Sequence, residues 1–261
     1  MAVDHGIFNE FPFLDGLENM PEVIAQLVEA GPAAVQMNYG QSDVLQSIVG
    51  KNKPALVMRV DIGNPYNPTT HDVMYDILQD ETNPILGALR MDAACVICNL
   101  LLLDEEPDLH RQTARNVGLL RNECDKYGMP LMVEPLVMRR NDSRGGYQSA
   151  VDKEQIVALV RHARELGADI IKADPTDNPD EYIAVIEAAR CPVLVRGGGK
   201  ADLMNVFEKS YAFLQQGAMG LVIGRNIYQH PNPTTITSAF MAMIHNDATP
   251  QEAWDIYQSG S

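Results

Sequence analysis

The sequence predicts an α/β fold, a single (β/α)8 barrel of the TIM type, and three observations lead to this prediction. The length of 261 residues matches the roughly 250 that eight strand–helix units need. Short apolar, often β-branched runs alternate with amphipathic helical stretches, a pattern typical of a parallel sheet with crossover helices. An apolar content of 46% is enough for one large core, and no linker or low-complexity segment divides the chain. We therefore expect one barrel domain over residues 1–261.

The apolar runs give eight strand candidates. In chain order they are Met1–Asp4, Ala33–Met37, Ala55–Asp61, Cys95–Leu101, Leu131–Val137, Ile170–Ala173, Val193–Arg196 and Gly220–Ile223. The first is short for a barrel strand, and no helix precedes it to cover the bottom of the barrel. We therefore expect a short or truncated first strand and a natural start upstream of Met1.

Amphipathic helix candidates lie between these strands. They are Pro21–Ala30, Asp43–Val49, Asn83–Met91, Asp108–Tyr127, Asp152–Leu166, Pro179–Ala189, Leu203–Gln216 and Thr234–His245, with a short tail helix near 249–258. Asp152 stands at a helix start and Gly167 just beyond the end of the same helix, as capping rules favour. Two irregular regions, Gly63–Asp80 and Asp142–Gln148, follow the third and fifth strands. In a barrel these are loops on the catalytic face.

Composition argues against several classes of partner. The formal net charge of −15 disfavours a nucleic-acid partner or an anionic membrane surface. No segment approaches the about 18 consecutive apolar residues of a membrane span, and Asp4 and His5 interrupt any signal peptide. Cys95 and Cys98 form a C-x-x-C motif inside a strand, where positions three apart face opposite sides and cannot share an ion. We expect reduced core thiols, no metal and a cytoplasmic protein.

Lys172 is the candidate nucleophile. It ends the run Gly167-Ala168-Asp169-Ile170-Ile171-Lys172, at the carboxyl end of the sixth strand, where barrel active sites are built. Burial lowers the pKa of a lysine, so a buried Lys172 would offer a neutral amine that can form a Schiff base with a carbonyl substrate. The alternative is a lysine whose tip emerges into solvent at the strand end.

Glu134 is the candidate general acid/base, because it is a carboxylate in an otherwise apolar fifth strand, one strand from Lys172. It could instead be a core carboxylate paired with a neighbouring arginine. Arg59 and Asp61 lie two apart on one strand face, so they either bind substrate or form an ion pair with each other. His5 is either a base or a polar residue at a loop start, and the second interpretation is favoured.

Two glycine turns predict a phosphate site. Arg196-Gly197-Gly198-Gly199-Lys200 follows the seventh strand and opens a helix, and Ile223-Gly224-Arg225-Asn226 follows the eighth. Glycines let backbone N–H groups approach an anion closely, and loops seven and eight are the usual phosphate site of this barrel. The residues expected to bind substrate are Arg196, Gly198, Gly199, Gly224 and Arg225.

These motifs resemble the class I aldolases of the deoxyribose-phosphate, fructose-bisphosphate and tagatose-bisphosphate type. The resemblance is carried by Ala2-Val3-Asp4-His5-Gly6, the run that ends in Lys172, the two glycine turns and Gly217-Ala218-Met219-Gly220. It implies a (β/α)8 fold, Lys172 as the Schiff-base residue, and Asp4 as an aspartate that orients substrate and proton transfer. It also implies that the two turns bind phosphate.

The sequence departs from parts of this family. Leu136 stands where archaeal-type fructose-bisphosphate aldolases carry a tyrosine acid/base. The context Val133-Glu134-Pro135-Leu136 is similar to the tagatose-bisphosphate and sulfosugar-phosphate aldolases, which use a glutamate. Arg196 stands where deoxyribose-phosphate aldolases have a second lysine, and it could either depress the pKa of Lys172 or bind a substrate anion.

We expect a class I aldolase, a lyase that needs no metal or cofactor, acts on a phosphorylated keto sugar and forms a homo-oligomer. Two alternatives stay open. The same lysine could serve acyl transfer or aldol synthesis on a phosphorylated dione or an aromatic precursor, and the barrel could bind a sugar phosphate without catalysis.

Overall fold

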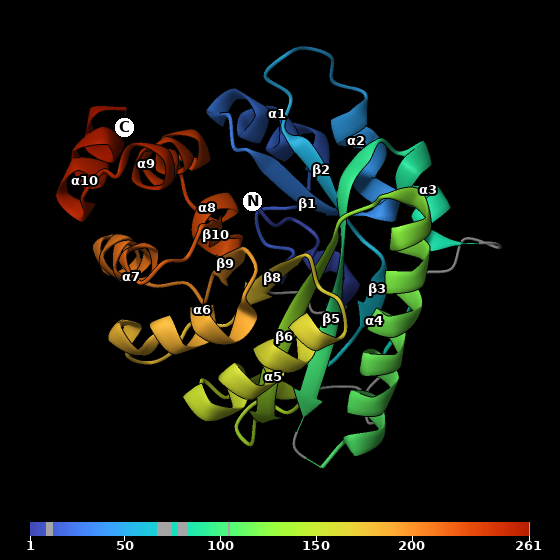
Figure 1. Ribbon diagram of the computed structural model, residues 1–261. Coiled ribbons are helices and arrows are strands. Elements are labelled where there is room, and N and C mark those ends of the chain that lie inside the picture. Colours follow the sequence, from blue (N-terminus) through green and yellow to red (C-terminus); the bar gives the residue numbers. More distant parts are fainter. Residues whose placement is uncertain (9–12, 67–74, 78–82, 104, 261) are drawn as a thin grey trace.

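The computed structural model describes residues 1–8, 13–66, 75–77, 83–103 and 105–260. A curved sheet of parallel strands lies at the centre, with helices around its outside (Figure 1). Neighbouring strands follow one another in chain order. They are β1 (Ala34–Asn38), β2 (Ala55–Arg59), β5 (Ala93–Leu103), β6 (Leu131–Arg140), β8 (Ile170–Ala173), β9 (Val193–Arg196) and β10 (Gly220–Val222).

The segment Met1–Asp4 closes the sheet. The backbone N–H of Ala2 donates to the Ile223 carbonyl at 3.0 Å, and that of Val3 donates to the Gln36 carbonyl at 3.0 Å. Ala2 also forms a parallel bridge with Gln36. The segment therefore lies between the last strand and the first, and the prediction of a (β/α)8 barrel with a short first strand is confirmed.

Each predicted helix has a counterpart, although the ends differ by a few residues. The helices are α1 (Met20–Ala30), α2 (Ser42–Gln46), α3 (Pro84–Arg90), α4 (Pro107–Tyr127), α5 (Lys153–Glu165), α6 (Ile183–Ala189), α7 (Leu203–Gln215), α9 (Pro233–Asn246) and α10 (Pro250–Ser259). The Asp152 side chain caps α5 by accepting from the Gln155 N–H at 2.9 Å, as expected from its position. The predicted helix Pro179–Ala189 is divided, because a 3₁₀ turn (Pro179–Glu181) precedes α6.

Three short helical segments among the described residues were not predicted. They are the 3₁₀ helices η1 (His5–Phe8) and η3 (Tyr39–Gln41) and the helix α8 (Arg225–Tyr228), and each follows a barrel strand. Three or four residues are too few for an amphipathic period to be recognised in a sequence.

Two β-hairpins extend the barrel on its carboxyl side. Strands β5 and β6 are longer than predicted, and β6 turns back into β7 (Tyr147–Ser149) in an antiparallel pair. Strand β3 (Asp61–Gly63) pairs with β4 (Tyr75–Ile77), and β4 lies within the region Gly63–Asp80 that was expected to be an irregular loop. Residues 67–74 and 78–80 of that region lie outside the described part of the chain.

The buried apolar residues that the structure describes form three clusters. The largest lies between the sheet and the helices and contains Cys98, a second contains Leu101 and Leu136, and the third fills the barrel interior and contains Val57, Cys95 and Met132. The two cysteines therefore face opposite sides of β5, as predicted, and burial raises the thiol pKa of Cys95 to about 12. Within the described residues, no helix is long and apolar enough to cross a membrane, and no group of three or more His, Cys, Asp or Glu side chains is arranged to hold a metal.

Candidate active site

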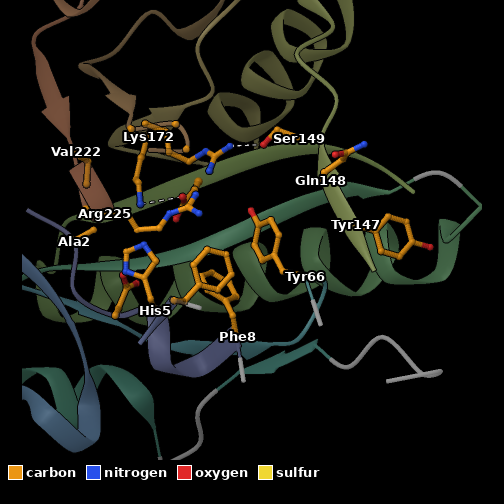
Figure 2. Close-up of a pocket in the computed structure, with 18 of the residues that line it drawn as sticks. Ala2, His5, Phe8, Tyr66, Tyr147, Gln148, Ser149, Lys172, Val222 and Arg225 are labelled. Carbon is orange, nitrogen blue, oxygen red and sulfur yellow. Dashed lines mark hydrogen bonds and ion pairs between the residues drawn. The ribbon is translucent and has the colours of Figure 1, made fainter. Parts of the chain in front are cut away.

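A cavity of about 490 Å³ opens at the carboxyl ends of the barrel strands. Figure 2 shows that its walls come from both ends of the chain, with His5 and Phe8 facing Lys172 and Arg225. The polar residues predicted for the site gather here, except Asp61. Lining residues include Asp4, His5, Arg59, Tyr66, Glu134, Lys172, Arg196, Gly198, Gly199, Gly224 and Arg225.

Lys172 and Glu134 form a buried pair. The Nζ atom of Lys172 lies 2.9 Å from Oε1 of Glu134 and donates to Oε1 of Gln36 at 3.3 Å. Lys172 is only 4% exposed, so the alternative of a solvent-facing tip is wrong. Burial lowers the pKa of Lys172, against the opposing effects of Glu134 and Asp4. The site therefore favours the neutral amine more than water does.

Arg59 joins three carboxylates. Its guanidinium pairs with Asp4, with Oδ1 of Asp61 at 2.9 Å and with Oε2 of Glu134 at 2.5 Å. Although burial raises the pKa of Glu134, Lys172 and Arg59 outweigh it and hold that pKa below its usual value. Glu134 is thus both a core carboxylate paired with an arginine and a cavity residue, so the two interpretations of the sequence are compatible.

Asp61 lies behind Arg59 and does not reach the cavity. It is fully buried, and its Oδ2 accepts from the backbone N–H of Asn99 at 2.5 Å. The sequence left open whether Arg59 and Asp61 bind substrate or pair with each other, and the structure shows the pair. Asp61 therefore anchors Arg59, and we correct its expected place in the substrate-binding wall.

Asp4 is tied to the same network through Gln36. The Gln36 Nε2 donates to Oδ2 of Asp4 at 2.6 Å, while its Oε1 accepts from Lys172. Burial alone would raise the pKa of Asp4, but Arg59 and Lys172 hold it well below the usual range. The sequence reasoning missed Gln36, although a lone polar residue in the apolar run Ala33–Met37 was a usable signal.

The glycine turns form one end of the cavity. The Gly197 N–H donates to the Val222 carbonyl at 2.8 Å, which joins the two turns. A Cβ at Gly198 or Gly199 would meet nothing within 4 Å, so the space beside these backbones is open. At Gly224, a Cβ would lie 2.9 Å from the Ala2 carbonyl oxygen, which makes a side chain there unfavourable.

The helix after the first glycine turn begins at the predicted residue. Helix α7 starts at Leu203, and Asp202 caps it by accepting from the Asn205 N–H at 3.2 Å. Its first N–H groups are therefore partly satisfied by a carboxylate. In the second turn, the Arg225 guanidinium lies over the Phe13 ring, 4.7 Å from its centroid.

Arg196 contacts an acidic side chain and the β6–β7 hairpin. Its Nε pairs with Asp174, and its Nη2 donates to the Ser149 hydroxyl at 2.5 Å. Burial and the acidic neighbours of Lys172 have the largest effects on its pKa, and among cations Arg59 has the largest. The contact of Arg196 with substrate stays a prediction.

Two residues that line the cavity were not predicted as site residues from the sequence. His5, interpreted as a polar residue at a loop start, lines the cavity, and its Nδ1 is buried without a hydrogen-bond partner among the described residues. Burial lowers the pKa of His5 to about 4, so the imidazole is neutral. Tyr66 enters from the loop after β3. No pattern in that irregular region marked it, because loop side chains have no periodicity.

The chain belongs to the DeoC/LacD family of aldolases, whose family model matches residues 1–230. It is similar to an uncharacterised aldolase of Saccharolobus solfataricus, with 29% identity over 98% of this chain and 92% of the relative. A second relative is a 3-hydroxy-5-phosphonooxypentane-2,4-dione thiolase of Salmonella typhimurium, with 28% identity over 99% of this chain and 81% of the relative.

Solved structures support the fold. An archaeal fructose-1,6-bisphosphate aldolase, whose catalytic lysine carries the carbinolamine intermediate of its substrate, aligns with a TM-score of 0.76. The alignment covers 94% of this chain and 92% of that one, at 20% sequence identity. The predicted class of protein, an aldolase on a TIM barrel, is thus confirmed.

Proposed function

We propose that this protein is a class I aldolase that cleaves or forms a C–C bond in a phosphorylated keto sugar through a Schiff base on Lys172. The observation that carries the proposal is the buried pair of Lys172 and Glu134, 2.9 Å apart, at the carboxyl ends of the strands. A buried amine next to a carboxylate can lose its proton to that neighbour without the proton entering water.

Lys172 attacks the substrate carbonyl in its neutral form. The new C–N bond uses the nitrogen lone pair, and loss of water gives an iminium that withdraws electrons from the adjacent carbon. In cleavage, Glu134 removes the proton of the hydroxyl group, the C–C bond breaks, and its electron pair forms an enamine. Asp4 and Gln36 hold the side chains of Lys172 and Arg59 in place and so act as positioning residues.

The turns at Gly198, Gly199 and Gly224, together with Arg225, bind the substrate phosphate in this proposal. Open space beside the glycine backbones and a guanidinium at the same end of the cavity support it. A phosphate fixed there would hold the carbonyl against Lys172. Arg196 and Ser149 face the part of the substrate farther from the phosphate. We also expect the protein to act in the cytoplasm and as a homo-oligomer.

The test is reductive trapping. Borohydride added with a phosphorylated ketose that is turned over should leave a stable adduct on Lys172, located by peptide mass spectrometry, and Lys172→Met should carry none. A panel of phosphorylated ketoses screened for retro-aldol cleavage identifies the substrate for this experiment. Turnover of a ketose without any adduct would refute the Schiff-base mechanism.

A second candidate is acyl transfer, and the thiolase-named Salmonella relative supports it. The same Lys172 would attack a ketone of a phosphorylated dione, and cleavage would then deliver an acyl group to a thiol acceptor. Product analysis separates the two candidates, because an aldolase releases an aldehyde whereas acyl transfer consumes the thiol and forms a thioester.

A further inference from the structure

Tyr66 brings a phenol into the cavity from a loop rather than from a strand. Figure 2 shows its ring between Phe8 and the strand that carries Gln148, with the hydroxyl oxygen directed toward the side where Lys172 and Ser149 lie. The ring lies edge-on against Phe8, with centroids 5.0 Å apart, and against Phe13, at 5.5 Å. Two aromatic neighbours of this kind restrict the ring to one orientation.

The backbone at Tyr66 is held by the β6–β7 hairpin. The Tyr147 N–H donates to the Pro65 carbonyl at 2.8 Å. Gly146 has a φ of +65°, and a Cβ there would lie 2.8 Å from the Tyr66 carbonyl oxygen. The Tyr66 ring also packs against the buried cluster that contains Leu136. Contacts from two parts of the chain thus fix where the phenol enters the cavity.

The hydroxyl group of Tyr66 lies among the charges of the site. Arg196, Asp174 and Glu134 are the neighbours that act most on it, and Tyr66 in turn acts on Arg196. Burial raises the pKa of Tyr66, so the phenol is neutral at physiological pH and can donate its proton. Glu134 is ionised and accepts protons, so the two groups have opposite roles.

We propose that Tyr66 is the acid that protonates the aldehyde oxygen when the C–C bond forms. When the bond breaks, Glu134 takes the Tyr66 proton through one water and the phenolate takes the hydroxyl proton, so that Glu134 receives this proton by way of Tyr66. This rests on the proposed function. Glu134 takes a proton from the carbon beside the Lys172 iminium, and the C–H electron pair becomes the enamine. The enamine carbon bonds to the aldehyde carbon, the C=O π pair moves to oxygen, and that oxygen takes the Tyr66 proton.

The protons then balance between Glu134 and Tyr66. The Glu134 carboxyl returns its proton through one water to the Tyr66 phenolate, so both residues regain their starting states. Hydrolysis of the iminium releases the product from Lys172. In this scheme, Glu134 alone exchanges the proton on the ketone carbon, whereas only the bond-forming and bond-breaking step needs Tyr66.

This division of labour can be measured with Tyr66→Phe, which removes only the hydroxyl group. The first assay is deuterium exchange from D2O into dihydroxyacetone phosphate alone. The second is aldol addition of dihydroxyacetone phosphate to glyceraldehyde 3-phosphate. We expect exchange within about twofold of wild type, and kcat of addition lower by about 10²- to 10⁴-fold, the usual contribution of an acid.

The matched control is Tyr147→Phe, because the Tyr147 hydroxyl contacts Glu106 at 3.4 Å and points away from the other side chains drawn in Figure 2. It should keep both rates, while Glu134→Gln should lose both. Tyr66→Phe that keeps both rates, or loses both equally, would overturn the assignment. Absence of exchange and of a borohydride adduct in the wild type would overturn the proposed function itself.

Discussion

The two ends of the barrel are built from the same strands but differ in chemistry. At the carboxyl ends, the cavity contains Lys172, Glu134 and Arg59, joined by ion pairs. At the amino ends, a second cavity of about 410 Å³ is lined mostly by apolar side chains such as Met132 and Leu194. Two positions along one face of β6 separate Met132 from Glu134.

The difference shows which positions are constrained by charge and which by shape. In the charged end, each group depends on several partners, because a buried charge without a partner is costly. In the apolar end, side chains of similar volume can replace one another at small cost. The following variants test this contrast, beginning with the largest effect.

Lys172→Met should lower kcat/KM by about 10⁴-fold or more, as expected when a nucleophile is removed. The free energy of unfolding should stay equal or rise, because Met fills a similar volume and Glu134 keeps its contact with Arg59. Urea unfolding followed by circular dichroism measures it. A loss of several kcal/mol would mean that Lys172 serves a structural ion pair, as a non-catalytic barrel would require.

Glu134→Gln and Met132→Leu form a matched pair on one strand face. The first keeps the shape but removes the base, so kcat should fall by about 10²- to 10⁴-fold. The second should leave kcat unchanged and cost less than about 1.5 kcal/mol of stability. Steady-state kinetics of both variants measures the contrast, and equal losses of activity would contradict the separation of the two ends.

The sequence allowed the order of strands and most helices to be predicted, because apolar periodicity and capping residues are local properties. Lys172, Glu134 and the glycine turns were also found, since charged residues and glycines at strand ends are recognisable without structure. Each of these signals is carried by a few adjacent residues.

The partners of these residues could not be predicted. Arg59 joins Asp4 and Glu134, which lie 55 and 75 positions away in the sequence. These contacts depend on closure of the barrel. Tyr66 was missed for a related reason, because its place in the cavity is set by the β6–β7 hairpin. A non-local contact leaves no periodic trace in a sequence.

Arg59→Met should destabilise the charged end by about 3–5 kcal/mol, because the variant leaves buried carboxylates without their cation. Arg161→Met is the matched control, since Arg161 pairs with Glu165 on the surface of α5 and such pairs contribute about 0.3–0.5 kcal/mol. Urea unfolding at neutral pH compares the two. Similar costs would show that the three-carboxylate network adds nothing beyond a surface pair.

His5 should make the stability of the charged end of the barrel depend on pH. Its pKa is lowered by burial to about 4, whereas an unfolded histidine has a pKa of about 6.5. The stability that the neutral ring contributes is therefore complete above pH 6.5 and is lost as the pH falls toward 4, because only the unfolded chain takes up the proton there. We expect this loss to be about 1–3 kcal/mol in the wild type.

His5→Phe should remove that part of the pH dependence, since the ring is surrounded by Phe8, Phe13 and Tyr228 and a phenyl group does not titrate. Unfolding free energies measured at pH 7, 5.5 and 4.5 give the slope of stability against pH. Met132→Leu, at the apolar end, should keep the slope of the wild type. If His5→Phe kept it too, the proton uptake would belong to other groups, and the pH response would not arise from the His5 side of the cavity.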